Sequence, residues 1–517
     1  MSNVIQCPTW HDISKMITDD DVREMKNHGL DLRCYEQVSA LAHKIYYYLG
    51  YKLMPPGRSW SDAQITTYNN WLINDMPKDA AHQAQIIDER NAALATADRR
   101  VRKDINQLDS TEKEKLKDAF QWLMDQDPKT EADYNPNALC YFSLAAKHWY
   151  PVPTFCQHHI YGYLPWHRWQ MLDFEDALRS APGCQDVTLP YWNIETGEFP
   201  QLISEPPFKD YTFPINVYPD YYDPPTDIGK QGTTTERNSS FQGSNVVNQC
   251  INNARTAPKF SQYNGITNYK YDSSSHIMRA HDRGHVGSGK TMANQDIAAF
   301  DPMFWFFHCN WDRLWWEWQS SRNATDLEGF KETLESCDDQ KWLIDPQMSI
   351  SDPFSKKNSD SIDITQLEIT YTRPEETLEK VKDFPLPLAI GPSWRDQNDG
   401  QSTLSTFTIA KENLNRVSLR VKGVNRIKVP GSFWVVLYLG GEEVGRDAFF
   451  QSTFSGNCEN CVAQAKVNFD FVFDRSHLTD VEGNPKEIKV EVISAITDEV
   501  MPFDAIGNPT INIRMLH

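Results

Sequence analysis

The segment that most limits how this chain can fold is an aromatic run at residues 300–318. It reads Phe-Asp-Pro-Met-Phe-Trp-Phe-Phe-His-Cys-Asn-Trp-Asp-Arg-Leu-Trp-Trp-Glu-Trp. So many large apolar rings require burial, so we expect this run to form part of a core. His308 lies inside it, and a buried imidazole must be hydrogen-bonded or bound to a metal. Asp312 follows one helical turn later, where it could orient a metal-bound imidazole or form an ordinary hydrogen bond.

A second histidine pair, His281 and His285, has the i, i+4 spacing of one helical face. In the sequence His-Asp-Arg-Gly-His, both imidazoles can reach one ion. Gly287 and Gly289 follow and are expected to end the helix. Alone, such a pair is a weak signal, because the same spacing arises by chance on helix surfaces.

Three more histidines lie upstream on separate predicted elements. His148 ends an apolar helical stretch, and His158 lies in an irregular loop nine residues before His167. The helix that carries His167 is expected to begin near Pro165, whose fixed φ suits a first helical turn. A single such histidine is more often a hydrogen-bonded core residue than a ligand. Three imidazoles from separate elements, however, can converge on one metal ion.

The ligand types favour copper over zinc. Imidazole binds copper, zinc, iron and nickel, so spacing alone does not select the metal. A zinc hydrolase is the main rival, but the segment at residues 281–285 lacks the Glu that such enzymes use as general base. Two sites of three histidines, without carboxylate or thiolate ligands, suit copper that changes oxidation state. We therefore expect two copper ions as cofactors.

Composition excludes several classes of partner. With 51 Lys and Arg against 71 Asp and Glu, the net charge is −20, which argues against nucleic acid and anionic membranes. No apolar run reaches membrane-spanning length, and the N-terminus has polar residues where a secretory signal would be apolar. The ten cysteines are spread over 517 residues, unlike a disulfide framework. A cytoplasmic location is the resulting expectation.

The chain divides by sequence pattern into four predicted segments. Residues 1–97 are expected to be a helical N-terminal extension, and residues 98–372 a helical metal-binding domain. Residues 373–402 contain several Pro and charged residues and are predicted to be a linker. Residues 403–517 contain short alternating segments and are predicted to form a β-sandwich or barrel. These segments are Ser418–Lys422, Phe433–Leu439, Lys466–Phe473, Lys489–Ile493 and Thr510–Arg514.

Between Val101 and Tyr371 the chain resembles the type-3 copper proteins, which are tyrosinases, catechol oxidases and haemocyanins. The resemblance rests on the order of Leu-Pro-Trp-His-Arg at 164–168, the pair at 281–285, and Asp-Pro-Met-Phe-Trp-Phe-Phe-His at 301–308. It implies a mainly α-helical domain, a four-helix bundle around a dicopper site, followed by a C-terminal β-sandwich. It implies copper A on His148, His158 and His167. It implies copper B on His281, His285 and His308.

Two residues beside the second copper A ligand need separate interpretation. Cys156 stands two residues before His158, as in the fungal and molluscan members whose cysteine forms a thioether bond with that histidine. The alternative is a buried free thiol. His159 is not expected to be a ligand, because only His158 has the family's nine-residue step to His167. His276 is expected at the surface.

Residues near copper B are expected to set the substrate range. Asp282 occupies a position where relatives place a residue that helps to remove the phenol proton, and its carboxylate could accept that proton. Alternatively, Asp282 forms a salt bridge with Arg279 or Arg283 and has no chemical role. Val286 is expected to be an apolar wall. The loop at residues 290–297 is expected to flank the cavity mouth.

Residues 403–517 also resemble the β-rich domain that covers the active site in latent fungal tyrosinases and molluscan haemocyanins. The resemblance implies that an aromatic residue enters the substrate pocket, with Phe449, Phe450 and Phe454 as candidates and ordinary strand core as the alternative. Cys458 and Cys461 form a C-x-x-C pair that could transfer copper, since thiolates suit Cu(I). A local disulfide is the other interpretation.

The expected function is that of a copper-dependent polyphenol oxidase. It would use O2 to oxidise o-diphenols to o-quinones and would also hydroxylate monophenols, so its partners would be a small phenol and O2. An oxygen carrier similar to haemocyanin is the main alternative, and an oxidase of o-aminophenols is another. A single functional unit without the many-unit repeat of molluscan carriers favours an enzyme. The sequence leaves the oligomeric state open.

Overall fold

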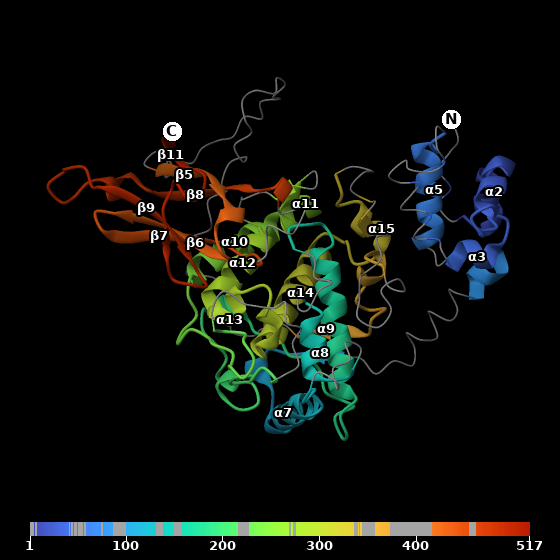
Figure 1. The fold of residues 1–517 in the computed structure, drawn as a ribbon, viewed down its shortest axis with the longest axis horizontal. Coiled ribbons are helices and arrows are strands. Elements are labelled where there is room, and N and C mark those ends of the chain that lie inside the picture. Colours follow the sequence, from blue (N-terminus) through green and yellow to red (C-terminus); the bar gives the residue numbers. More distant parts are fainter. Residues whose placement is uncertain are drawn as a thin grey trace. The chain divides into compact units, whose positions relative to one another are not determined.

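The fold was examined in a computed structural model, shown in Figure 1. The description covers residues 5, 8–40, 42, 45, 49, 55, 58–73, 76–85, 100–130, 138–148, 158–215, 227–267, 270–271, 276–335, 340, 342–343, 357–372, 416–453 and 462–516. Contacts within the chain define two compact units. The first is Met1–Arg102, Gly162–Asp173 and Leu314–Thr372, and the second is Lys103–Tyr161, Phe174–Arg313 and Arg373–His517.

The first unit contains short N-terminal helices around an apolar core. The helices are α1 (Trp10–Met16), α2 (Asp19–Lys26), α3 (Tyr35–Ala40) and α5 (Asp62–Ile73). Helices α1 and α2 each begin with a capping box, which satisfies backbone N–H groups that a helix start leaves unpaired. The core contains Ile13, Val38, Tyr68 and Trp71, all at most 1% exposed. Residues 1–97 were predicted to be a helical extension, and the described part of this segment contains these four helices.

The remainder of the first unit packs around a second, smaller apolar cluster. Its buried members are Trp169, Leu172, Ile364 and Ile369. Strands β1 (Arg100–Arg102) and β4 (Ile369–Tyr371) pair in parallel within this unit. The unit also contains α15 (Leu327–Lys331) and η7 (Ser359–Ser361).

The helical elements of the second unit carry most of the predicted site. They include α7 (Ser110–Asp125), α8 (Tyr141–Ala146), α10 (Ser244–Thr256), α11 (Phe260–Asn264), α12 (Ile277–Ser288) and α13 (Lys290–Ala293). Short 3-10 turns and strands connect them: η1 (Ile105–Gln107), η3 (Ile194–Thr196), η4 (Gln201–Ser204), η5 (Ala298–Phe300), β2 (Ile266–Thr267) and β3 (Lys270–Tyr271). Two longer helices, α9 (Tyr163–Arg179) and α14 (Met303–Ser321), continue from one unit into the other.

Helix α14 is the aromatic run that the sequence predicted to be buried. Phe304, Trp305, Phe307 and Trp315 are all fully buried. Helix α9 begins at Tyr163, earlier than predicted, because Pro165 was expected to stand shortly before the start. Pro165 instead lies in the first turn, where a missing N–H breaks no helical hydrogen bond.

The C-terminal part of the second unit consists of two antiparallel sheets, red and orange in Figure 1. One has the order β10-β9-β6-β7 and the other the order β11-β5-β8. Inward-facing residues from both sheets, among them Leu419, Val435, Phe469 and Val492, form one hydrophobic cluster. The strands are β5 (Arg416–Asn425), β6 (Phe433–Leu439), β7 (Glu442–Phe449), β8 (Lys466–Asp474), β9 (Ile488–Ser494), β10 (Val500–Met501) and β11 (Thr510–Leu516), with turns η10 (Arg426–Lys428) and η12 (Arg475–Leu478).

All five strand segments predicted from alternation are therefore strands, and two sheets that share a core have the arrangement of a sandwich. The predicted linker at residues 373–402 lies outside the described residues. The boundaries at 97, 372 and 402 and the four-helix bundle remain predictions. None of the described helices is both long and apolar enough to cross a membrane.

Candidate metal centre

Helix α12 carries His281 and His285, and every residue of the helix is buried. His276 is the N-cap, and its Nδ1 accepts a hydrogen bond of 3.1 Å from the backbone N–H of Arg279. The expectation that His276 lies at the surface was wrong, since the residue is fully buried. An imidazole that accepts a backbone hydrogen bond at a helix start can be buried without leaving that N–H unsatisfied.

Two glycines allow α12 to lie close to its neighbours. A Cβ at Gly284 would lie 2.6 Å from the ring of Phe307 on α14, and a Cβ at Gly287 would lie 2.1 Å from the backbone oxygen of Gln242. Gly287 was predicted to break the helix, but α12 continues through it to Ser288. The role of Gly287 is thus close packing.

The structure brings His281, His285 and His308 together as one group. One nitrogen from each imidazole lies within 4.8 Å of the others, and all three residues are buried. The Nε2 atoms of His285 and His308 are 3.2 Å apart. Two nitrogens bound at about 2.0–2.1 Å to one tetrahedral ion would be about 3.3 Å apart. The spacing of this pair therefore fits two ligands of a single ion.

His148, His158 and His167 form a second group with the same limit of 4.8 Å between their candidate ligand atoms. His148 follows α8, His158 begins the loop before α9, and His167 lies in the first turns of α9. Burial lowers the pKa of His167 to about 3, because an apolar environment disfavours the charged imidazolium. The neutral imidazole is the form that binds metals.

Backbone carbonyls orient three of these imidazoles through their Nδ1 atoms. The Nδ1 of His148 lies 3.2 Å from the Gln295 oxygen, that of His167 2.8 Å from the Tyr163 oxygen, and that of His285 2.9 Å from the Met292 oxygen. A carbonyl can only accept, so Nδ1 carries the proton and Nε2 is left for a metal. This donor set fits a metal that prefers neutral nitrogen ligands.

The two histidine groups lie beside each other. The imidazoles of His158 and His281 are stacked, with centroids 5.3 Å apart, and those of His148 and His308 are 6.3 Å apart. Neither group includes a carboxylate or thiolate among the described residues. Two adjacent sites of three imidazoles each therefore fit two copper ions better than Mg²⁺ or Ca²⁺, which prefer oxygen ligands.

Asp282 lies at the edge of this centre and contacts two imidazoles. Its Oδ1 is 3.0 Å from Nδ1 of His281, and its Oδ2 is 2.9 Å from Nε2 of His159. The carboxylate is fully buried, and burial raises its pKa above the ordinary value despite the attraction of His159. The backbone N–H of Phe450 also donates to it.

The two arginines considered as partners of Asp282 pair with another carboxylate. Arg279 and Arg283 both form ion pairs with Asp447 on β7, and Arg283 Nε donates to Asp447 Oδ1 over 2.6 Å. All three side chains are at most 6% exposed. Burial opposes ionisation of Asp447, but the two guanidinium groups outweigh it and hold the pKa of the carboxyl below its ordinary value.

The residues at the end of β7 lie directly against the histidines. The ring of Phe450 stacks on His285, and the ring of Phe449 stacks on His159 with centroids 4.9 Å apart. Asp296, in the segment after α13, accepts hydrogen bonds from Ser452 and from the backbone of Thr453. The C-terminal sheets are thereby fixed to the histidine centre by aromatic and polar contacts.

The structure shows where several predicted residues lie but does not test their roles. Asp312 is buried one turn after His308, and Val286 is buried beside His285. The loop at 290–297 is not an open rim: it contains α13, is almost fully buried, and supplies the Met292 and Gln295 carbonyls. The predictions for Cys156, Phe454, Cys458 and Cys461 concern positions outside the described residues.

Comparisons with known proteins agree with this geometry. A family model described as the common central domain of tyrosinase matches residues 138–321, the part that carries all six histidines. A tyrosinase of Hahella sp. is 29% identical over 193 residues, which are 34% of this chain and 41% of that protein. Haemocyanin 1 of Megathura crenulata is 26% identical over 317 residues, which are 55% of this chain and 8% of that protein. The chain therefore spans less than half the length of either relative.

A longer match is found with a tyrosinase of Aspergillus oryzae, which is 23% identical over an alignment of 493 residues that covers 70% of this chain and 86% of that protein. Among solved structures, a tyrosinase from Burkholderia thailandensis has a TM-score of 0.54 at 17% identity, covering 80% of this chain and 100% of the other. The apo-protyrosinase of Aspergillus oryzae has a TM-score of 0.52 at 13% identity, covering 80% and 92%. These structures show the fold. Residues 138–321 thus match the central domain of tyrosinase, and the chain is similar to type-3 copper proteins, among them tyrosinases and haemocyanins.

Proposed function

We propose that this protein is a copper-dependent oxidase of phenols. The observation that carries the proposal is the pair of adjacent three-histidine groups, one with His148, His158 and His167, and the other with His281, His285 and His308. Each group would hold one copper ion. Bound copper would supply the redox chemistry, by which electrons pass from the phenol to O2.

The overall reaction balances without a further reductant when the substrate is a catechol. Two catechols each lose two electrons and two protons to become o-quinones, and one O2 takes up the four electrons and four protons as two water molecules. A monophenol would receive one oxygen atom of O2 on the ring and be oxidised to the o-quinone, while its two lost electrons and two protons convert the other oxygen atom to water. We propose both activities for this chain, as the tyrosinase relatives suggest.

The protein's own residues would orient the ligands and handle the substrate proton. Carbonyls of Tyr163, Met292 and Gln295 hold three of the imidazoles in the tautomer that leaves Nε2 free for a metal. The carboxylate of Asp282 is proposed to accept the proton of a monophenol hydroxyl. The neighbouring cations Arg279 and Arg283 form their ion pairs with Asp447.

The C-terminal sheets are proposed to act as a cover that restrains activity. Phe450 lies over His285, where a flat aromatic substrate would also have to approach the second copper. If the cover restrains the enzyme, cleavage between residues 372 and 402 should raise the rate of phenol oxidation. An unchanged rate after clean cleavage would exclude this role.

The test of the proposed function is to load the full chain with copper and measure O2 uptake with tyrosine, with a catechol and with an o-aminophenol. Uptake that requires two copper ions per chain supports the oxidase, and the three substrates separate tyrosinase, catechol oxidase and aminophenol oxidase. The second candidate is an oxygen carrier, favoured by the haemocyanin relatives. Reversible O2 binding without turnover, before and after cleavage, would favour the carrier over the oxidase.

A further inference from the structure

His159 was set aside in the sequence as a histidine without a metal, yet the structure gives it several contacts in the centre. Its Nε2 lies 2.9 Å from Asp282 Oδ2, and the side chains are 7% and 0% exposed. The other oxygen of Asp282 lies 3.0 Å from Nδ1 of His281. One buried carboxylate therefore joins His159 to a residue of the second histidine group.

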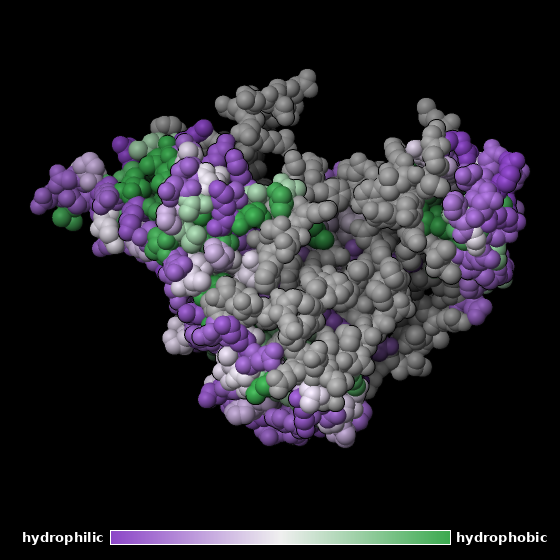
Figure 2. Space-filling model, in the orientation of Figure 1, coloured by the Kyte–Doolittle hydropathy of each residue, from purple (hydrophilic) through white to green (hydrophobic). Residues whose placement is uncertain are grey.

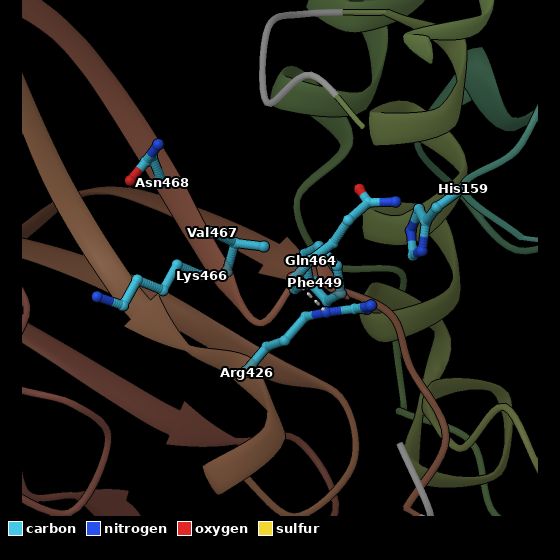
Figure 3. Close-up of a pocket in the computed structure, with 7 residues that line it drawn as sticks. All are labelled: His159, Arg426, Phe449, Gln464, Lys466, Val467 and Asn468. Carbon is cyan, nitrogen blue, oxygen red and sulfur yellow. Dashed lines mark hydrogen bonds between the residues drawn. The ribbon is translucent and has the colours of Figure 1, made fainter. Parts of the chain in front are cut away.

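The other side of His159 is held by the C-terminal sheets. Phe449 stacks on the imidazole at 4.9 Å and 30°, and the guanidinium of Arg426 lies 5.0 Å from the centre of the Phe449 ring. Arg426 is itself fixed by a 3.0 Å hydrogen bond from Nε to the backbone oxygen of Gln464. Figure 3 shows His159, Phe449, Arg426 and Gln464 gathered together, while the ends of Lys466 and Asn468 point away.

The backbone of His159 has a conformation that also requires support. Its φ is +57°, in the left-handed region that residues with side chains rarely adopt. Such a conformation persists only where surrounding contacts hold the residue, and these residues concentrate at functional sites. His158, one residue earlier, belongs to the first histidine group. Two adjacent imidazoles therefore have different surroundings: His158 belongs to the first histidine group, and His159 contacts Asp282.

We propose that His159 is a positioning residue, which fixes the Asp282 carboxylate and through it the imidazole of His281. In this arrangement the proton on Nδ1 of His281 points at Asp282 Oδ1, so that its Nε2 is presented to the metal. His159 holds the second oxygen, which prevents the carboxylate from turning away from His281. The inference rests on the proposed function only in assuming that the metal is copper.

Two substitutions separate the hydrogen bond from the packing. His159→Phe keeps an aromatic ring against Phe449 but removes the nitrogen that contacts Asp282. His159→Gln is the matched control, because its amide nitrogen can occupy the place of Nε2. In the full chain, copper per chain and copper affinity are measured by chelator competition, with circular dichroism and thermal unfolding as checks of folding.

The Phe variant should bind copper at the second histidine group about 10 to 100 times more weakly than the unsubstituted chain, the usual effect of losing a residue that orients a metal ligand. The copper affinity of the Gln variant should stay within about threefold of that of the unsubstituted chain, because its amide nitrogen can still donate to Asp282. Copper affinity that is unchanged in His159→Phe would overturn the proposal. Equal weakening in both variants would also overturn it, because packing and not the hydrogen bond would then be responsible.

A double-mutant cycle with Asp282→Asn tests whether His159 acts through Asp282, and it remains informative if one variant is poorly stable. The effect of His159→Phe on copper affinity should largely vanish in the Asp282→Asn background, and fully additive effects would contradict the proposed route. Copper binding does not depend on turnover. A chain that binds two coppers but oxidises no phenol would refute the proposed function while leaving this inference testable.

Discussion

The ring of Phe450 lies parallel to the imidazole of His285, with centroids 4.0 Å apart and 9° between the planes. The two residues come from the C-terminal sheet region and from α12, and each is fully buried. A stacked ring in this place shields His285 from anything that approaches along the same face. The contact thus joins a candidate metal ligand directly to the C-terminal sheet region.

Phe450→Ala should increase phenol oxidation by the full chain, by about tenfold if the ring occupies the substrate's position. The physical reason is that the space above His285 becomes open while the sheets stay attached through Asp447 and Asp296. Initial rates with a catechol at several concentrations measure the effect, and a fall in KM is expected. Phe469→Ala, in the core between the sheets, is the control: it should lower stability by about 3–5 kcal/mol without opening the site. Equal rates in the Phe450 variant and the unsubstituted chain would exclude the ring as a barrier.

Asp447→Asn should loosen the C-terminal sheets from α12. The substitution leaves Arg279 and Arg283 buried without their charged partner, and removal of one member of a buried ion pair costs about 3–5 kcal/mol. Limited proteolysis of the folded chain should become faster, and phenol oxidation should rise with it. The control is Glu443→Gln, which removes a partly exposed ion pair with Arg446 and should change stability by about 1 kcal/mol or less. Proteolysis at the unsubstituted rate in the Asp447 variant would argue against this cluster as the attachment.

His285→Ala and His308→Ala should each reduce bound copper from two ions to one per chain and abolish phenol oxidation. Two imidazoles cannot replace the three-nitrogen site, and the electron transfer to O2 needs both coppers in the proposed reaction. Metal analysis after dialysis and O2 uptake are the measurements. His82→Ala serves as the control, since His82 belongs to neither histidine group. Full activity with one copper per chain would refute the dicopper proposal.

The stability of the protein should depend on pH through the carboxyl group of Asp127. Burial raises the pKa of its carboxyl from 3.8 to about 7, against the opposing hydrogen bonds from Tyr211 and from the backbone of Phe142. Between about pH 4 and pH 7 the folded state keeps a proton that the unfolded state has lost. The free energy of unfolding should therefore fall as pH rises through this window and level off above it.

Asp127→Asn removes this titration, so the advantage of the unsubstituted chain over the variant should shrink from pH 4.5 to pH 7.5. Urea unfolding at several pH values measures the difference, with the exposed residue Asp118 substituted by Asn as the control. Parallel stability profiles for the Asp127 variant and the unsubstituted chain would contradict the expectation.

Figure 2 shows many hydrophilic residues on the visible described surface of α7, whereas hydrophilic and hydrophobic residues are mixed over the C-terminal strands. A net charge of −20 requires that many charged side chains lie at the surface. Composition could predict the character of the surface because charged side chains are almost never buried without a partner. It could not predict that Asp447, Arg279 and Arg283 would be buried together, since their mutual pairing depends on the fold.

The sequence by itself determined the features that repeat within one element. The spacing of His281 and His285, the burial of His308 in its aromatic helix and the alternation of the C-terminal strands all follow from the helical and strand periods. The order of the motifs was enough to predict the two groups of histidines, which the structure brings together. It could not test which metal they hold.

Only the tertiary structure decided the contacts between residues far apart in the chain. His159 and Asp282 are 123 positions apart, and Arg279 and Asp447 are 168 positions apart. No periodicity relates such positions, because loops and packing decide which elements meet. For this reason Asp282 appeared in the sequence as a candidate partner of its neighbouring arginines. In the folded chain those arginines instead form ion pairs with Asp447 of the C-terminal sheet. His159 lies beside Asp282, because a buried carboxylate needs a hydrogen-bonding partner.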